Sequence, residues 1–222
     1  MVICNICNWR GENFKNLDLG YGRFYKRAIC PSCKSQPRHR SIYKYITENE
    51  IIPKNRHIKL LHFAPEKIFV DLFKSYLNIE YLSVDIDPKK AMIVEDITNL
   101  SFKDSSFDII CCIHVLEHVV NDNKAMHEMC RILKKDGFAL LDVPINCEQE
   151  KTYENPTIID PVERTKAFWQ WNHVRLYGTD FDSKLNEAGF KVNSGNLVSF
   201  FKEEDINKYG LERKAIHYCT KE

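Results

Sequence analysis

Short apolar runs alternate with helix-like segments from residue 58 onward, and this alternation constrains the fold more than any other feature of the sequence. The runs that we expect to be strands are 58–63, 80–84, 93–94, 107–113 and 138–143. Segments 65–76 and 121–134 have apolar residues at helical spacing, and Asn121 and Gly137 are typical start and stop residues for the second helix. Strands that alternate with helices predict an α/β fold with a parallel sheet covered on both faces.

Polar side chains stand at the ends of these predicted strands. In chain order they are His62 and Glu66, Asp85, Asp96, and His114. Ligands bind beyond the carboxyl ends of parallel strands, so we expect these side chains to lie along one edge of the sheet. A carboxylate such as Asp85 can accept hydrogen bonds from both hydroxyls of a nucleoside ribose. The alternative is that Asp85 or Asp87 only caps the following helix.

Four of the nine cysteines form a repeated pattern, Cys4-x-x-Cys7 and Cys30-x-x-Cys33, with 22 residues between the pairs. Two such pairs supply the four thiolates of a tetrahedral Zn²⁺ site, whereas a redox dithiol would need only one pair. Four sulfur ligands leave no open position on the ion, so we expect structural zinc. The other cysteines have no pairing rhythm, and we expect buried free thiols in a reducing compartment: Cys111, Cys112, Cys130, Cys147 and Cys219.

Charge is distributed unevenly along the chain. Residues 1–60 contain twelve Lys or Arg and four Asp or Glu, a net charge of +8, so residues 61–222 carry −7 of the total of +1. The basic part could bind an anionic partner such as nucleic acid, or it could dock on the acidic part.

We expect a zinc ribbon at 1–40, a linking helix at 41–57 and a larger domain at 58–222.

A basic turn, Arg38-His39-Arg40, precedes the predicted linking helix. These side chains could grip a phosphate or a carboxylate, or they could be the solvated start of the helix. The sequence favours neither interpretation.

No apolar run approaches the roughly 18 residues that a membrane-spanning helix needs. The first residues also lack the basic and apolar stretches of a secretory signal. We therefore expect a soluble, cytoplasmic protein without a membrane partner.

Several segments resemble the S-adenosylmethionine-dependent methyltransferases of class I, the seven-stranded, type 11-like family. The segments that carry the resemblance are 81–88, 95–108, 114–118 and 131–137, followed by 185–192 as the late helix and sixth strand and 215–220 as the seventh strand. The resemblance extends over roughly residues 58–222 and implies a doubly wound, mostly parallel seven-stranded sheet. The zinc ribbon lies outside it, although some family members carry such a ribbon.

The resemblance also implies roles for residues at the sheet edge. Asp85 would bind the ribose hydroxyls of S-adenosylmethionine, Asp96 the adenine amino group, and Ile97 the adenine ring through its backbone. His114 would face the methionine part of the cofactor and the reacting methyl group, which makes it a catalytic candidate as well. Independently of the resemblance, Glu117-His118 could orient the site, or could only cap and brace the loop after the fourth strand.

The loop after the first predicted strand, His62-Phe63-Ala64-Pro65-Glu66, departs from the family pattern because it contains no glycine. Glycine there lets the cofactor approach the backbone. Ala64 is small enough for that approach and Glu66 could receive the ammonium group of the cofactor, so we interpret the loop as a functional variant. His62, Phe63, Ala64 and Glu66 are accordingly cofactor-binding candidates. The alternative is a protein that kept the fold and lost the cofactor.

A long segment, 146–178, lies between the fifth predicted strand and the late helix. Connections of this length are usually lids or binding loops. Trp169, Trp171 and Arg175 suit a planar or sugar-like acceptor, and His173 could remove the acceptor proton as a general base near neutral pH. The alternative is that the aromatic side chains cover the core while His173 and Arg175 brace the lid.

These patterns favour a methyltransferase that acts on a small-molecule or carbohydrate acceptor, with S-adenosylmethionine as cofactor and structural Zn²⁺ in a ribbon that helps to seat the acceptor. The alternative is a zinc-ribbon protein that binds nucleic acid and whose larger domain modifies RNA or is not catalytic. A nicotinamide-dependent enzyme is the weakest hypothesis, because the G-x-G-x-x-G fingerprint is absent.

Overall fold

The computed structural model describes residues 1–20, 24–193, 201–213 and 216–221. They form two compact units, one from residues 1–54 with the described part of 195–216, and one from residues 55–194 with the described part of 217–222. Helix α7 (Glu203–Tyr209) belongs to the amino-terminal unit, whereas the sequence placed this segment in the larger domain. Among the described helices, none combines the length and the apolar character that a membrane span requires.

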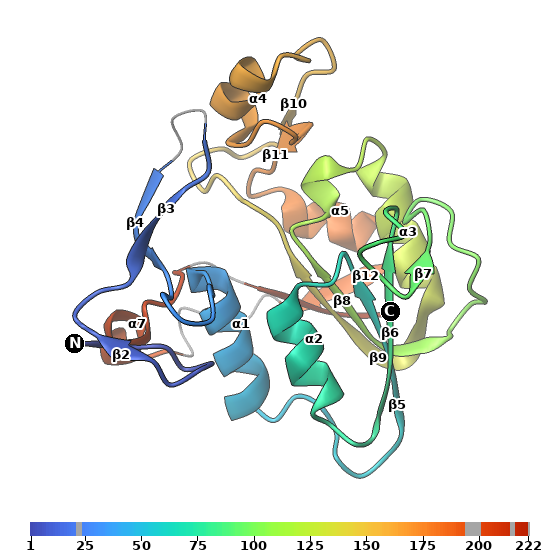
Figure 1. Cartoon of the computed structure of the whole chain (residues 1–222). Helices are drawn as coiled ribbons and strands as arrows, with labels where there is room; N and C mark the ends of the chain where they lie inside the picture. The colour runs from blue at the N-terminus through green and yellow to red at the C-terminus, as the bar shows by residue number, and fades with distance from the viewer. Residues whose placement is uncertain (21–23, 194–200, 214–215, 222) are drawn as a thin grey trace. The chain divides into compact units, whose positions relative to one another are not determined.

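The larger unit is built on a seven-stranded sheet in the order β12-β13-β9-β8-β5-β6-β7 (Figure 1). The strands are β5 (Ile58–Phe63), β6 (Ile79–Asp85), β7 (Ile93–Val94), β8 (Phe107–Ile113), β9 (Leu133–Asp142), β12 (Phe190–Asn193) and β13 (His217–Lys221). Strands β5 to β9 pair in parallel, and β13 is antiparallel to both β9 and β12. The prediction of a mostly parallel seven-stranded α/β sheet is confirmed, and residue 215 of the expected last strand lies outside the described residues.

Helices lie on both faces of the sheet. Helix α2 (Lys67–Lys74) lies on one face, where Phe69 and Phe73 contact the ring of His62. Helices α3 (Asp122–Ile132) and α5 (Phe181–Glu187) pack on the opposite face against Leu61 and Phe63. Alternate residues of β5 therefore serve different faces, as the two-residue period of a strand requires.

Helix α3 starts as predicted but ends differently. The Asn121 side chain accepts a hydrogen bond from the Lys124 backbone N–H at 3.0 Å, so Asn121 is the expected cap. The helix stops at Ile132, and Gly137 lies inside β9 rather than at the helix end. A Cβ atom at Gly137 would lie 2.6 Å from the backbone oxygen of Asp108, so the close approach of two strands explains this glycine.

The amino-terminal unit contains two small antiparallel sheets and two helices. Its elements are β1 (Val2–Ile3), β2 (Arg10–Gly11), β3 (Lys15–Asp18), β4 (Phe24–Ile29), α1 (Pro37–Glu48) and α7. The guanidinium of Arg40 is fully buried, lies 4.0 Å from the centre of the Phe14 ring, and donates to the backbone oxygens of Ser35 and Gly210 at 2.7 and 2.8 Å. His39 completes the amino-terminal cap of α1. Arg40 and His39 thus stabilise this unit, and a phosphate cannot reach the Arg40 guanidinium in this conformation.

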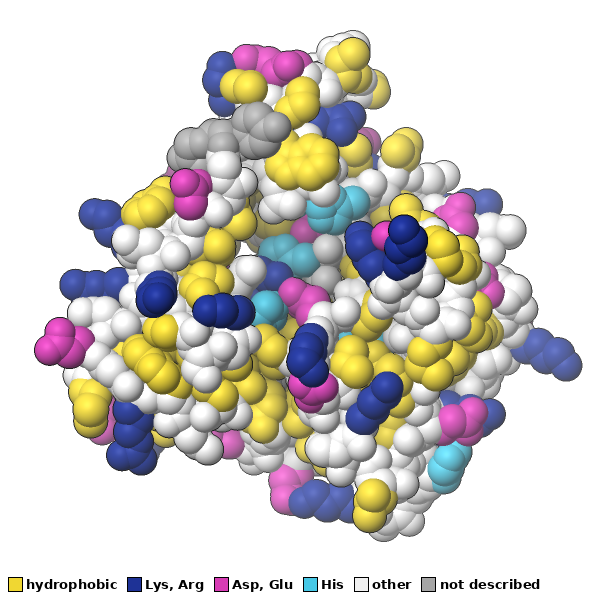
Figure 2. All heavy atoms as spheres, in the orientation of Figure 1, with side chains coloured by type: hydrophobic (Ala, Val, Ile, Leu, Met, Phe, Trp, Pro, Cys, Tyr) yellow, Lys and Arg dark blue, Asp and Glu magenta, His cyan; other side chains and the backbone are white. Residues whose placement is uncertain are grey.

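Exposed basic and aromatic side chains lie next to each other on β4. Phe24 and Tyr25 are 53% and 42% exposed, and Lys26 and Arg27 follow them on the same exposed strand. On the face shown in Figure 2, Lys and Arg side chains occur singly or in small groups.

The segment 146–178 forms a small structure of its own within the larger unit. It contains β10 (Tyr153–Glu154), α4 (Pro161–Phe168) and β11 (Arg175–Leu176), and β10 pairs with β11 in antiparallel fashion (Figure 1). Its beginning and end lie side by side, because the Asn146 backbone N–H donates to the Tyr177 oxygen at 2.8 Å.

Candidate active site at the carboxyl edge of the sheet

The loop after β5 adopts a conformation that glycine usually provides. Ala64 has a φ of 44°, in the left-handed region, and its N–H donates to the Val84 oxygen at 2.9 Å. Glu66 follows as the cap residue of α2. The side chains of His62 and Phe63 are instead buried in the two faces of the sheet. Ala64 and Glu66 therefore stand at the edge, and the proposed role of His62 and Phe63 in binding the cofactor stays a prediction.

The side chain of His62 has an environment that differs from an open binding site. Its Nδ1 lies 3.0 Å from the Tyr81 hydroxyl, and its ring packs edge-on against Phe69 and Phe73. Burial lowers the pKa of His62 to about 4, although the charge of Glu66 acts in the opposite direction. The His62 ring is a neutral, packed group at physiological pH.

Asp85 stands at the end of β6 and holds a turn with one carboxylate oxygen. Its Oδ1 accepts the backbone N–H of Asp87 at 2.8 Å, and Oδ2 has no hydrogen-bond partner among the described residues. No helix lies between β6 and β7 in the described structure, so the alternative in which Asp85 caps a helix does not hold. The carboxylate is half-buried and keeps one oxygen to accept hydrogen bonds.

Asp96 forms a similar turn after β7. Its Oδ1 accepts the backbone N–H and the hydroxyl of Thr98, both at 2.8 Å, and these hydrogen bonds lower the pKa of Asp96. The side chain of Ile97 is buried in the core, and this burial fixes the backbone between Asp96 and Thr98. Asp96 is exposed, so its second oxygen faces solvent.

His114 lies between two buried carboxylates. Its Nδ1 is 2.9 Å from Glu117 Oε1 and its Nε2 is 3.4 Å from Asp142 Oδ2. Glu117 belongs to a single 3₁₀ turn, η1 (Leu116–His118), and is fully buried. Burial raises the pKa of Glu117, but the charge and hydrogen bond of His114 outweigh burial and lower it. Glu117 is therefore ionised at neutral pH.

His118 and His173 also lie close to Glu117. Their rings meet edge to face with 4.8 Å between centres, and His173 Nε2 is 3.9 Å from Glu117 Oε1. His173 is 3% exposed, and burial lowers its pKa to about 4. This environment disfavours the predicted general base that titrates near neutral pH, and it brings His173 next to Glu117 rather than to open solvent.

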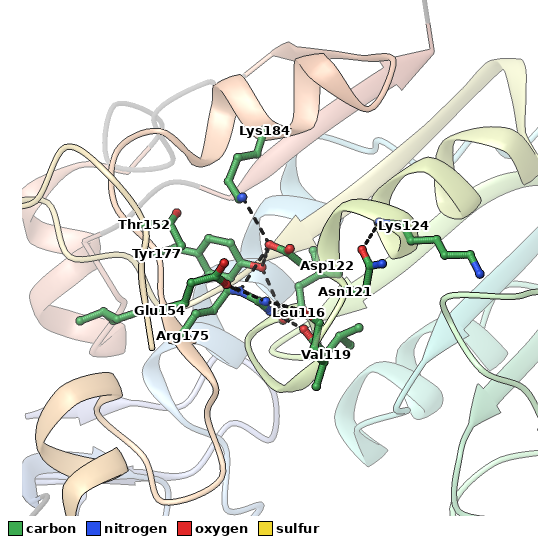
Figure 3. Close-up of polar contacts among 12 residues, drawn as sticks. Leu116, Val119, Asn121, Asp122, Lys124, Thr152, Glu154, Arg175, Tyr177 and Lys184 are labelled. Carbon is green, nitrogen blue, oxygen red and sulfur yellow. Dashed lines mark hydrogen bonds and ion pairs between the residues drawn. The ribbon is translucent and has the colours of Figure 1, made fainter. Parts of the chain in front are cut away.

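Arg175 holds the loop that carries Glu117 and His118 (Figure 3). Its guanidinium is buried and donates to the backbone oxygens of Leu116 at 3.0 Å, Val119, and Val120 at 2.9 Å. The Tyr177 hydroxyl donates to Asp122 Oδ2 at 2.8 Å in the same network. The contacts of Arg175 thus match the alternative in which it has a bracing role, and Tyr177 is buried in the core, as the same alternative expects of the aromatic side chains. Trp171 remains 47% exposed on the segment.

The four cysteines of the amino-terminal unit gather as predicted. Sγ of Cys4 lies 3.6 Å from Sγ of Cys33, and Sγ of Cys7 lies 3.7 Å from Sγ of Cys30. Four sulfurs at about 2.3 Å from one tetrahedral Zn²⁺ would be about 3.8 Å apart, so the cluster fits zinc. All four thiols are free of disulfides.

The two cysteine pairs also share one backbone geometry. Cys4 N–H donates to the Trp9 oxygen at 2.8 Å and Cys30 N–H donates to the Ser35 oxygen at 3.0 Å, five residues further on in each case. The residue that follows each Cys-x-x-Cys pair has a positive φ, 59° for Asn8 and 62° for Lys34.

Of the remaining cysteines, Cys147 is exposed and differs from the buried thiol that the sequence predicted.

Comparison with known proteins identifies the class of the sheet domain. Residues 62–141, from the end of β5 to the end of β9, match the family model described as a methyltransferase domain. This part of the chain is therefore similar to methyltransferase domains, and the predicted resemblance to the class I enzymes is confirmed there.

Two curated relatives match parts of the chain. An uncharacterized protein of Methanocaldococcus jannaschii is 40% identical over 81 residues, which are 34% of this chain and 35% of that protein. The uncharacterized methyltransferase YcgJ of Bacillus subtilis is 31% identical over 114 residues, which are 51% of this chain and 38% of that protein. The chain spans little more than a third of the length of these relatives.

Solved structures share the fold. A chain of the Haloferax volcanii complex between the Trm112 methyltransferase activator and a proposed methyltransferase superposes with a TM-score of 0.59 and 13% identity, covering 82% of this chain and 90% of that one. The [4+2]-cyclase SpnF superposes with a TM-score of 0.58 and 11% identity, covering 82% and 81%. A cyclase among these structures illustrates that the fold alone does not define the reaction.

Sequence reasoning missed one member of the site. Asp142 faces His114 from the end of β9, although in the sequence it stands within an apolar run and had no predicted role. The available signal was a single acidic residue in the otherwise apolar run 138–143. A buried charge of this kind needs a partner, which His114 provides.

Proposed function

We propose that the protein is an S-adenosylmethionine-dependent methyltransferase that acts on a small-molecule or carbohydrate acceptor. The observation that carries the proposal is Asp85, which ends β6 with one oxygen fixed in a turn and the other available for a ribose hydroxyl. The left-handed backbone of Ala64 supports it, because it supplies the turn that glycine makes in the family.

The residues at the edge of the sheet would bind and orient the cofactor. Asp85 would accept hydrogen bonds from the ribose and Asp96 from the adenine amino group, while Glu66 would pair with the ammonium group. S-adenosylmethionine would supply a methyl group bonded to a sulfonium, and methyl transfer depends mainly on in-line positioning of the acceptor. His114 is held between Glu117 and Asp142. It would keep the neighbouring side chains in place around the methyl group that is transferred.

The segment 146–178 supports a small or sugar-like acceptor. Trp171 and Tyr153 expose 47% and 43% of their surface on it, and aromatic faces of this kind pack against planar molecules and sugar rings. We further propose that the four-cysteine cluster binds structural Zn²⁺ and that the protein is cytoplasmic.

Calorimetry with S-adenosylmethionine or S-adenosylhomocysteine tests the cofactor assignment. Asp85→Ala should weaken binding by about 1–3 kcal/mol, because it removes charge-assisted hydrogen bonds. Asp71→Ala is the matched control, since Asp71 is an exposed carboxylate that pairs with Lys67 on α2. Unchanged affinity in Asp85→Ala, or no binding by the native protein, would refute the assignment.

One observation favours the nucleic-acid alternative. Phe24 and Tyr25 are exposed beside Lys26 and Arg27, and stacking aromatic groups next to basic groups suit single-stranded RNA. Retention on RNA at increasing salt decides between the two acceptor classes. A steep salt dependence that Lys26→Ala reduces, together with weaker retention of Tyr25→Ala, would support RNA, whereas no retention at low salt would exclude it.

A further inference from the structure

We propose that Glu117, His118 and His173 form a binding site for a divalent transition-metal ion, separate from the four-cysteine cluster. One ligand atom from each side chain lies within 4.8 Å of the other two. The three residues come from two distant segments, the 3₁₀ turn after β8 and the end of the segment 146–178. This inference goes beyond methyl transfer, because metal binding can be measured without cofactor or acceptor.

The tautomers of the two histidines suit metal coordination. His173 Nδ1 lies 2.8 Å from the Phe168 backbone oxygen, and His118 Nδ1 lies 3.2 Å from the Asn172 backbone oxygen. A carbonyl oxygen only accepts hydrogen bonds, so each Nδ1 carries the proton and each Nε2 keeps a lone pair. Histidines that bind metals are oriented in this way by a carbonyl or a carboxylate behind the ring.

Glu117 supplies the negative charge that such a site needs. Its carboxylate is fully buried. Oε1 lies 2.9 Å from His114 Nδ1 and 3.9 Å from His173 Nε2. Oε2 has no hydrogen-bond partner among the described residues. A buried ionised carboxylate with an oxygen that lacks a partner is costly, and a cation beside it removes that cost.

The ligand set selects the class of metal. Two imidazoles and one carboxylate bind Zn²⁺ in catalytic zinc sites and Fe²⁺ in non-haem iron sites, whereas Mg²⁺ and Ca²⁺ prefer oxygen ligands. Ligand atoms bound at about 2.1 Å to one ion lie about 3.0–3.4 Å apart, so the three side chains would draw together by about 1 Å on binding. Three protein ligands leave a position open for water or for a hydroxyl group.

The alternative is a polar cluster that needs no metal, in which Glu117 is neutralised by His114 alone. The two explanations differ in a direct way. A metal would tie the end of the segment 146–178 to the loop after β8, so adding the ion would raise the thermal stability of the native protein. A self-sufficient cluster would show no such response.

The test uses full-length protein that has been loaded with zinc at the cysteines, and Co²⁺ as the probe. The native protein should take up about one further equivalent of Co²⁺, without the thiolate-to-cobalt charge-transfer band that a four-cysteine site gives. The proton NMR spectrum should contain two exchangeable, paramagnetically shifted signals from the Nδ1–H groups of the coordinating histidines. Co²⁺ should also raise the unfolding temperature.

Variants locate the site. Glu117→Gln, His118→Ala and His173→Ala should each lower the Co²⁺ affinity at least about tenfold, since even outer residues of metal sites contribute that much. His127→Ala is the matched control: His127 Nδ1 also lies 2.8 Å from a backbone oxygen, that of Asn123, but the side chain is exposed on α3. Its affinity should equal that of the native protein.

The native protein alone can overturn the proposal, so a variant that does not fold leaves no ambiguity. No Co²⁺ uptake beyond the zinc already present, or uptake with fewer than two shifted histidine signals, would refute the site. Uptake that survives in folded His118→Ala and His173→Ala would place the ion elsewhere and would also refute it. None of these outcomes depends on whether the protein binds S-adenosylmethionine.

Discussion

Ala64 and His114 directly follow two neighbouring strands and share the left-handed backbone conformation, with φ angles of 44° and 54°. Strands β5 and β8 pair in parallel, so the two residues lie at the same edge of the sheet. The Ala64 backbone N–H donates to the backbone oxygen of Val84 on β6, and the His114 backbone N–H donates to the backbone oxygen of Asp142 on β9. Non-glycine residues in this region cost about 1 kcal/mol or more each, and such strain gathers at functional sites.

Substitution of Ala64 should test this strain. Ala64→Gly should leave the free energy of unfolding within about 0.5 kcal/mol of the native value, because the relief of strain offsets the greater freedom of glycine in the unfolded chain. Ala64→Val should lower it by about 2 kcal/mol or more, since a β-branched residue fits the left-handed region poorly. Urea unfolding measures both changes.

Ala91 is the control for this pair of variants. It lies in the loop between β6 and β7, and its φ is not positive. Ala91→Val should therefore change the free energy of unfolding by less than about 1 kcal/mol. If Ala64→Val and Ala91→Val have the same free energy of unfolding, the proposed backbone strain at Ala64 is contradicted.

The periodicity of the sequence was sufficient to predict the sheet. Strands β5, β7 and β8 have the predicted bounds, because each is a short, mostly apolar run. The positions of Asp85 and Asp96 followed from the same pattern, since the ends of parallel strands meet at one edge. The cysteine spacing likewise predicted the cluster that the structure contains.

Contacts between distant segments could not be predicted in this way. Periodicity gives the face of a residue but not its partner, so nothing in the sequence paired His173 with Glu117 or Asp142 with His114. Gly137 has the same explanation: its role depends on the approach of Asp108 from another strand. Arg40 belonged to a basic turn in the sequence, and only the fold buries it.

Removal of Arg175 should loosen the loop that carries Glu117 and His118. Arg175→Met should lower the free energy of unfolding by about 3 kcal/mol, because three backbone oxygens lose a donor and buried Asp122 loses a cation 3.5 Å away. Arg164→Met is the control, since the Arg164 guanidinium donates to the Ile158 backbone oxygen at 3.0 Å; this variant should cost about 1 kcal/mol or less. Equal losses in the two variants, measured by urea unfolding, would contradict the bracing role.

Removal of the Zn²⁺ that we propose for the cysteine cluster should unfold the amino-terminal unit as a whole. Arg40 links β4 and α1 to Gly210 at the end of α7, so these elements should lose protection together when a strong chelator is added. Hydrogen exchange of β5 and β8 in the larger unit should stay unchanged.

A cysteine variant separates this effect from damage by the chelator. Cys7→Ser should reproduce the loss of protection without chelator, whereas Cys147→Ser, at an exposed thiol outside the cluster, should not. Protection of α1 that persists in metal-free protein would show that the unit folds without the ion.

His62 should make the stability of the protein depend on pH between about 4 and 6.5. Its pKa is about 4 in the folded state, through burial, against 6.5 for an exposed histidine, and the groups that face it are the Tyr81 hydroxyl and the Glu66 carboxylate. The unfolded chain therefore binds a proton that the folded protein excludes, so stability is full above pH 6.5 and is lost as the pH falls toward 4. Between pH 7.5 and pH 5 this one group should remove about 2 kcal/mol. Urea unfolding of His62→Phe should show a pH dependence smaller by that amount, while His127→Ala, at an exposed position, should match the native protein; the same slope in all three would rule out His62 as the origin.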